Sequence, residues 1–242
     1  MTDTGGMTME AFARTELLWG REAMEKLEKA HVAVFGVGGV GAACCEALCR
    51  GGVGKMTLFD PDAVSETNLN RQLVALHSTI GINKADVMKE RSLDINPCLQ
   101  VQAEKVFYSA ENAHLYPLDG YDYVVDCIDT VSSKLLLIET AHKSGVPIIS
   151  ALGAGNKEDP TLFRVADIYD TKVCPLARAL RSRLKKMGIE KHLCVYSEEA
   201  PLETAEVLEE NGRHLPGSLS FVPPVMGMIL AGEVLKRLAG RK

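Results

Sequence analysis

The sequence predicts a doubly wound α/β fold, with helices on both faces of a mostly parallel sheet. Short apolar runs alternate with amphipathic segments from residue 31 to residue 152, which is typical of parallel strands joined by helical crossovers. The first apolar run ends in a glycine turn with the spacing Gly36-x-Gly38-x-x-Gly41. Small residues then open a helix, as in Rossmann-like units that bind phosphates.

Each expected element has a local signal. Apolar runs indicate strands, and apolar residues three or four apart indicate helices. Asn96-Pro97 ends one expected helix, and Pro175 begins another at its first position. In chain order, we expect one or two helices within 10–29, strands at 32–35 and 56–59 around a helix that ends at 51–52, a helix from 83 to 96, strands at 99–106 and 121–128, a helix at 134–142, strands at 147–152 and 162–168, a helix from 175, a strand at 193–196 and a helix at 224–238.

The domain organisation follows from length and pattern. A chain of 242 residues, 46% hydrophobic and 24% charged, suits one soluble domain. We expect an N-terminal helical segment at 1–30, a nucleotide-binding core at 31–152 and a C-terminal region at 153–242 for substrate and dimer contacts. Small residues in the last helix permit close packing, either in its own core or against a second subunit.

Composition excludes several classes of protein. The net charge of -5 argues against a chain that is basic all over. The longest apolar run, 221–235, contains Glu233 and is shorter than the roughly 18 to 20 residues of a membrane span. Seven cysteines without a C-x-x-C pair are typical of reduced thiols and not of a zinc site. With polar first residues and no secretory leader, we expect a cytoplasmic protein.

The glycine turn has a direct chemical use. Because Gly36, Gly38, Gly39 and Gly41 carry no side chain, a polyphosphate can approach the backbone amides and the positive dipole at the helix start. Asp60 ends the next apolar run and is placed to accept hydrogen bonds from a ribose. Taken alone, this pattern fits an NAD site.

The polar loop that follows Asp60 argues against a simple NAD site. Residues 60–73 are too polar for a strand, and they follow the carboxyl end of a parallel strand, where open α/β sheets bind ligands. Each polar residue alone could be a solvated turn, but the set favours a binding loop. Its polar members are Asp60, Asp62, Asn68, Asn70, Arg71 and Gln72.

Several charges are expected around the phosphates. Lys84 lies in the first turn of a helix, where it opposes the helix dipole, so an anion is its expected partner. Asp129 follows the fourth strand and offers a hard oxygen ligand for magnesium. With Arg71 and Arg14 as further cations, the site suits transfer of a nucleotidyl group from ATP better than hydride transfer.

The expected helix from Pro175 is strongly basic. Its cations are Arg178, Arg181, Arg183, Lys185 and Lys186. Such a run is usually a solvated helix face, and the spacing alone slightly favours that interpretation. The alternative is a surface that contacts a phosphate backbone.

The motifs together resemble a known family. G-V-G-G-V-G at 36–41, N-L-N-R-Q at 68–72 and D-C-I-D at 126–129 are similar to the adenylation domain of ubiquitin-activating-type enzymes, which include activators of sulfur carriers. The second half decides the branch, because its motifs resemble the tRNA threonylcarbamoyladenosine dehydratase family. They are D-P-T at 159–161, A-D-I-Y at 166–169, P-L-A-R-A-L-R at 175–181, V-Y-S-E-E at 195–199 and G-S-L-S-F-V-P at 217–223.

The resemblance implies roles for particular residues. Lys84 would contact the phosphates of ATP, Asp129 would hold magnesium, and Arg14 would enter the site of a neighbouring subunit in a homodimer. Cys174 stands where the family usually has Asp. The residues expected to bind ATP are Gly36, Gly38, Gly39, Gly41, Asp60, Asp62, Thr67, Asn68, Leu69, Asn70, Arg71, Gln72, Lys84, Asp129 and Thr130.

The resemblance also implies a reaction: ATP activates the threonyl carboxylate of a modified adenosine in tRNA, and a ring closes with release of AMP. This reaction favours the basic helix as a contact for tRNA. A cysteine desulfurase or sulfur-acceptor protein is a further candidate partner. Two alternatives stay open at this point. One is activation of a ubiquitin-like sulfur carrier, and the other is an NAD-binding oxidoreductase.

Overall fold

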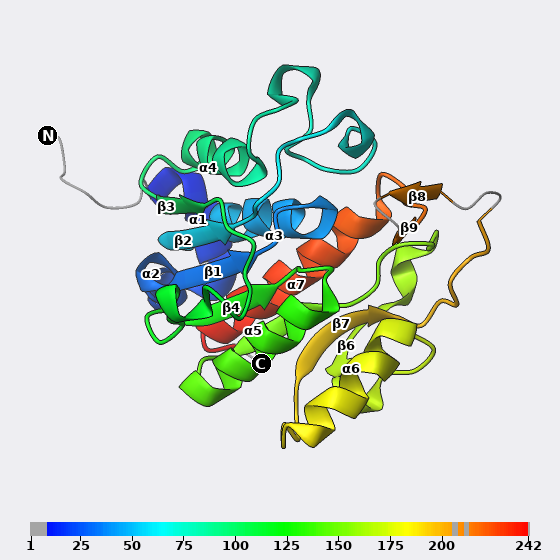
Figure 1. Cartoon of the computed structure of the whole chain (residues 1–242). Coiled ribbons are helices and arrows are strands. Elements are labelled where there is room, and N and C mark those ends of the chain that lie inside the picture. Colours follow the sequence, from blue (N-terminus) through cyan, green and yellow to red (C-terminus); the bar gives the residue numbers. More distant parts are fainter. Residues whose placement is uncertain (1–8, 205–207, 211–212, 242) are drawn as a thin grey trace, which may run out of the picture.

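The computed structural model describes residues 9–204, 208–210 and 213–241. Its centre is a seven-stranded sheet in the order β3-β2-β1-β4-β5-β7-β6 (Figure 1). Its strands are β1 (His31–Phe35), β2 (Lys55–Phe59), β3 (Gln100–Glu104), β4 (Tyr123–Asp126), β5 (Ile148–Ala151), β6 (Phe163–Asp167) and β7 (Leu193–Ser197). Neighbouring strands are parallel except β6, which runs antiparallel to β7 at one edge. The prediction of a mostly parallel α/β sheet is confirmed.

Helices cover both faces of the sheet and form two apolar cores with it. They are α1 (Met9–Trp19), α2 (Arg21–Lys29), α3 (Gly39–Arg50), α4 (Lys84–Ile95), α5 (Val131–Ser144), α6 (Pro175–Lys186) and α7 (Val222–Leu238). Val32 and Val34 of β1 face the core shared with α2, α3, α4 and α7. Ala33 and Phe35 face the core shared with α5 and α6. This alternation is the period-two pattern of a strand buried on both faces.

The carboxyl ends of β2, β1 and β4 meet at one edge of the sheet. The strand order reverses at β1, because β2 and β3 lie on one side of it and β4 and β5 on the other. Open α/β sheets bind ligands at such a switch point. Residues 36–38 follow β1, Asp60 follows β2 and residues 127–130 follow β4, so the fold brings these three expected site segments together.

Four strands are shorter than expected, those at 121–128 and 99–106 by the most residues, and one hairpin is new. The strand expected at 121–128 spans only Tyr123–Asp126, and just before it the Asp122 carboxylate accepts the His31 N–H at 2.7 Å. The strand expected at 99–106 spans only Gln100–Glu104. A hairpin of β8 (Leu208–Glu210) and β9 (Arg213–Leu215) lies in a segment for which the sequence predicts no strand.

The last helix packs into its own core. A Cβ at Gly227 of α7 would lie 2.2 Å from the Val40 carbonyl oxygen and 2.9 Å from the Ala43 Cβ, so glycine lets α7 and α3 approach closely. Ala231 is also buried, whereas a Cβ at Gly232 would meet no atom within 4 Å. In the described residues, no helix has both the length and the apolar character needed to cross a membrane.

Candidate active site

The glycine turn has the geometry of a phosphate loop. Gly36 has a φ of 91°, and a Cβ there would lie 2.6 Å from the Cys127 carbonyl oxygen. A Cβ at Gly41 would lie 1.8 Å from the Gly36 carbonyl oxygen. The first glycine therefore makes the tight turn, and the later one lets α3 pack directly against the strand, as in nucleotide-binding units.

The start of α3 is open to a ligand. The N-cap residue of α3 is Gly38, which has no side chain to cap the helix, so the first amides of the helix are available to an anion. Gln72 lies beside this turn, because its Nε2 would be 3.8 Å from a Cβ at Gly38. The Gln72 Oε1 is buried without a hydrogen-bond partner among the described residues. A cradle without side chains and an unpartnered amide oxygen both fit a bound nucleotide.

Asp60 is fixed at the end of β2 by two backbone amides. Its Oδ2 accepts the Val37 N–H at 2.6 Å and its Oδ1 accepts the Asp62 N–H at 2.9 Å. Burial raises the pKa of Asp60 above its ordinary value, although the hydrogen bond from Val37 and the charge of Lys84 partly offset this rise. A carboxylate has about four acceptor positions, so lone pairs remain for the hydroxyls of a ribose.

Lys84 has an internal anionic partner. Its Nζ lies 2.8 Å from Asp62 Oδ2, and its side chain is 9% exposed while that of Asp62 is 63% exposed. Asn83 caps α4 by accepting the Ala85 N–H at 3.0 Å, and its Nδ2 donates to the carbonyls of Asp60 and Asp62. An ammonium group has three donors, so Lys84 can hold Asp62 and a phosphate together.

The loop after β2 folds over the start of α3. A Cβ at Gly39 would lie 3.4 Å from the Arg71 carbonyl oxygen. The Arg71 guanidinium donates through Nη1 to the Thr67 carbonyl at 2.9 Å and to Asn70 Oδ1 at 2.8 Å. Asn70 Nδ2 in turn donates to the Ser218 carbonyl at 3.0 Å. The loop is thereby linked to the C-terminal region, and the Arg71 guanidinium has further donors that make no hydrogen bond to a described residue.

Two other members of this loop have structural positions. Asn68 is buried, and its Oδ1 accepts the Ser65 N–H at 3.2 Å. Leu69 packs against the core of α3 and α7. Both therefore shape the loop from within.

Asp129 lies at the same edge of the sheet, on the exposed turn between β4 and α5. It accepts a hydrogen bond from the Thr130 hydroxyl at 3.2 Å. In the described part of the chain, no three His, Cys, Asp or Glu side chains gather to hold a metal ion. A magnesium site would therefore combine Asp129 with phosphate oxygens, which is a common arrangement for this ion.

Arg14 and the basic helix lie outside this cluster. Arg14 is exposed on α1 and forms no hydrogen bond or ion pair with any described residue. On α6, Arg178, Arg183, Lys185 and Lys186 are exposed. Arg181 is only half exposed, because its Nη1 donates to the Thr171 carbonyl at 2.9 Å.

A buried polar network next to the site was missed from the sequence. Lys134 Nζ lies 2.6 Å from Asp126 Oδ2, and neither side chain is exposed. Ser150 Oγ donates to the same oxygen at 2.6 Å, and His192 Nε2 lies 2.8 Å from Ser150 Oγ. A lysine within the apolar run of α5 was the available signal, because a charge on a buried helix face requires a partner.

Comparison with known proteins identifies the family. Residues 12–242 match the ThiF family. The chain is 44% identical over 241 residues to the tRNA threonylcarbamoyladenosine dehydratase of Bacillus subtilis, with 95% of each protein covered. It is 40% identical over 202 residues to that of Escherichia coli, with 79% of this chain and 74% of the relative covered. A crystal structure of the E. coli enzyme in complex with ATP matches with a TM-score of 0.87 and 35% identity, over 96% of this chain and 95% of that one. The chain therefore belongs to the ThiF family and, within it, to the tRNA threonylcarbamoyladenosine dehydratases.

Proposed function

We propose that this protein uses ATP to close a ring on threonylcarbamoyladenosine in tRNA. The threonyl carboxylate attacks the α-phosphate of ATP and pyrophosphate leaves. The neighbouring carbamoyl group then attacks the acyl adenylate and releases AMP, so the nucleoside loses the elements of one water molecule. The observation that carries the proposal is the open glycine cradle at the start of α3, flanked by Asp60, Arg71 and Lys84.

The chain's own groups divide the work by position. The amides at the start of α3 bind phosphate oxygens, and Asp60 orients the ribose. Arg71 and Lys84 stabilise the charge that develops on the phosphates as pyrophosphate leaves, since preorganised cations act most strongly where charge appears. No protein nucleophile is required, because the substrate carries the group that accepts the acyl carbon.

Asp129 is the residue proposed to hold magnesium, with Thr130 as its neighbour. The exposed carboxylate at the carboxyl edge of the sheet fits an ion that keeps several waters and shares phosphate oxygens. When bound, magnesium would neutralise phosphate charge and make the α-phosphate easier to attack.

We also propose that the active unit is a homodimer. Leu17 and Leu18 of α1 are 86% and 77% exposed, and two large apolar side chains on one exposed helix suit burial by a second subunit. Arg14 lies on this helix with no partner among the described residues. It is free to serve the site of the neighbouring subunit.

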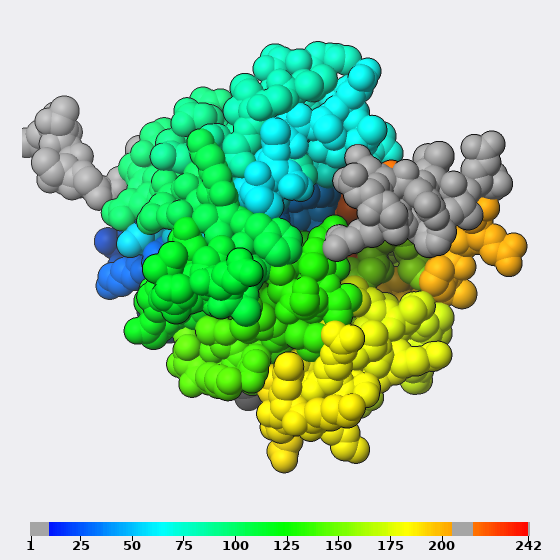
Figure 2. Space-filling model, viewed as in Figure 1, coloured from blue at the N-terminus to red at the C-terminus, as the bar shows by residue number. Residues whose placement is uncertain are grey.

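The basic helix α6 is the proposed contact for tRNA. Arg178, Arg183, Lys185 and Lys186 form no ion pair with the described residues, so no group in that part of the chain neutralises their charges. Figure 2 shows α6 (yellow) on the outer surface beside α5 (green). A tRNA substrate implies a cytoplasmic enzyme. A cysteine desulfurase or other sulfur-transfer protein stays a candidate partner.

The deciding experiment measures AMP. Purified protein is incubated with ATP and threonylcarbamoylated tRNA as the only co-substrate, and the nucleosides are analysed by mass spectrometry. We expect AMP release that matches conversion of the open nucleoside to the cyclic one, and none with tRNA that lacks the modification. AMP formation that requires a ubiquitin-like sulfur carrier instead of tRNA would select the first alternative, and tight NAD binding without ATP binding would select the second.

A further inference from the structure

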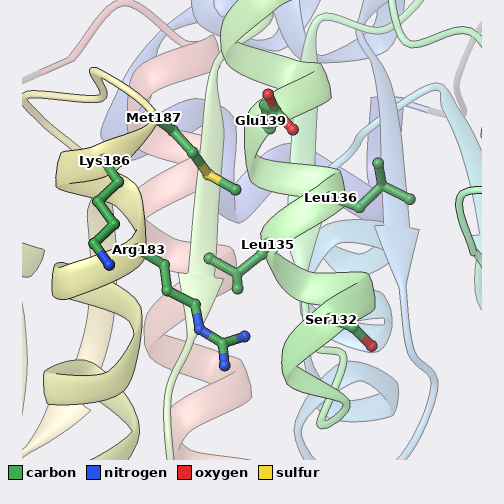
Figure 3. Close-up of a pocket in the computed structure, with 7 residues that line it drawn as sticks. All are labelled: Ser132, Leu135, Leu136, Glu139, Arg183, Lys186 and Met187. Atoms are coloured by element: carbon green, nitrogen blue, oxygen red, sulfur yellow. The ribbon is translucent and has the colours of Figure 1, made fainter.

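A groove lies between α5 and α6, which cover the same face of the sheet (Figure 3). Its volume is about 410 Å³. Leu135 of α5 and Met187, which follows α6, contribute apolar surface, and Figure 3 shows both side chains directed into the space between the helices. Leu135 is 5% exposed and Met187 is 41% exposed. On the α5 side the apolar surface of the groove is therefore packed into the core, and on the α6 side it is more exposed to solvent.

The rim of the groove is positively charged. Arg183 extends into the gap, and Lys186 lies on the same helix one turn further on. Neither forms an ion pair with another described residue. Glu139 also lines the groove, but its carboxylate is 2.6 Å from the Lys143 ammonium of its own helix. The rim therefore carries an excess of positive charge that no group in the described structure neutralises.

The groove begins close to the nucleotide site. Ser132 lies at one end of it and stands three residues after Asp129, in the first turn of α5. The groove therefore lies between the carboxyl edge of the sheet and the basic residues at the end of α6.

We propose that the groove receives one unpaired nucleotide of the RNA substrate, an inference that rests on the function proposed above. The face of the base would pack against Leu135 and Met187, and Arg183 with Lys186 would contact its phosphates. Glu139 would offer a carboxylate to the N–H groups of the base edge. Proteins recognise RNA mainly in single-stranded loops, where bases are splayed out onto side chains.

The dimensions favour a nucleotide over a peptide. Three apolar side chains, Leu135, Leu136 and Met187, line a space of about 410 Å³ that gives room for one ring system, whereas a stable protein interface buries roughly 1,200 Å² or more. The cations Arg183 and Lys186 beside the apolar side chains of the groove match a nucleotide, which carries a phosphate charge beside its base.

The test separates apolar from electrostatic contacts. The KM for threonylcarbamoylated tRNA is measured at several salt concentrations in Met187→Ser and Arg183→Ala. Met187→Ser should raise this KM about fivefold, the lower end of what removal of a base contact costs, and leave its salt dependence unchanged. Arg183→Ala should raise the KM and lower the salt slope by about one, because one phosphate contact is lost. The KM for ATP should stay the same in both.

The matched control is Met228→Ser. Met228 is 46% exposed on α7, similar to Met187, and does not line the groove. The inference is overturned if Met187→Ser and Met228→Ser have the same KM for tRNA, and the groove would then be open to another ligand such as an acidic peptide. This result is distinct from failure of the proposed function, in which the unaltered protein itself releases no AMP with the modified tRNA.

Discussion

Lys134 and Asp126 form an ion pair with the Nζ 2.6 Å from Oδ2 and no solvent exposure of either side chain. Lys134 also donates to the Ala151 carbonyl at 2.9 Å. The other carboxylate oxygen of Asp126 accepts the Ile128 N–H at 3.0 Å. The pair therefore joins α5, β4 and β5 and holds the first residues of the turn that carries Asp129.

Removing Lys134 should strongly destabilise the fold. Lys134→Met leaves a carboxylate buried without its counter-charge, and breaking such a pair costs roughly 3–5 kcal/mol. Urea unfolding measures the change. Lys143→Met is the control: Lys143 is also 2.6 Å from a glutamate on α5, but its side chain is 72% exposed, so we expect a loss of less than about 1 kcal/mol. Equal losses would contradict the account.

His192 should make stability fall in acid. Burial, helped by His142 and Lys134, lowers the pKa of His192 to about 3. An unfolded histidine takes up its proton near pH 6.5. Between pH 6.5 and pH 3, His192 is therefore protonated in the unfolded chain and neutral in the folded chain. The unfolding free energy is therefore fully retained above pH 6.5 and falls as the pH drops towards 3, by about 1.4 kcal/mol per pH unit from this group.

The check is the pH dependence of unfolding in His192→Gln, which should have a shallower slope between pH 6.5 and 4. His142→Gln should flatten it less, because His142 is partly exposed and burial lowers its pKa only modestly. Parallel curves for His192→Gln and the unaltered protein would rule out the assignment. His142 and His192 line a cavity at the amino ends of the strands, and the other charged side chains in its lining are Asp167, Lys191 and Arg237.

Local signals carried most of what the sequence could predict. Asn83 and Pro97 bound α4 because an N-cap and a proline act on their immediate neighbours. The roles of Gly36 and Gly41 could be predicted from the spacing Gly36-x-Gly38-x-x-Gly41, which lies within one turn of the chain. The lysine in the apolar run of α5 indicates that a buried partner is needed, but the partners could not be predicted, because the bonds of the network join residues 8, 24 and 42 positions apart. Likewise the Asp62 partner of Lys84 lies 22 positions away and depends on how the loop folds.

Lys84 should be required for adenylation. We expect Lys84→Met to lower turnover on the order of a hundredfold or more, the scale for loss of one preorganised charge. Pyrophosphate exchange measures it, and Arg71→Ala should show a similar loss. Lys105→Met is a matched control, because its ion pair with Asp86 of α4 is 2.6 Å long and exposed. Near-normal exchange in Lys84→Met would limit its role to holding Asp62.

Cys174 is the N-cap residue of α6. The resemblance to the family implies Asp at this position, and an N-cap position accounts for that preference because aspartate accepts hydrogen bonds from the first helix amides. The Cys174 sulfur accepts the Ala177 N–H at 3.5 Å, and sulfur is a weak acceptor. Cys174→Asp should raise the unfolding free energy by about 1 kcal/mol, since aspartate is a preferred cap. Thermal unfolding of Cys174→Asp and Cys174→Ala compares the two, and an aspartate variant less stable than the alanine variant would exclude the cap.

Arg14 should act on the neighbouring subunit. Arg14→Ala and Lys84→Met are each expected to be nearly inactive as pure proteins, because every site then lacks one charge. In a mixed dimer, the site of the Arg14→Ala subunit keeps its own Lys84 and receives Arg14 from the Lys84→Met subunit. If subunits exchange freely, half the dimers are mixed and each has one complete site of two, so an equimolar mixture should recover about a quarter of normal AMP release. Co-expression with two affinity tags isolates the mixed dimer, which should reach about half. An inactive mixed dimer would place Arg14 in the site of its own subunit, and normal AMP release by pure Arg14→Ala would place it outside catalysis.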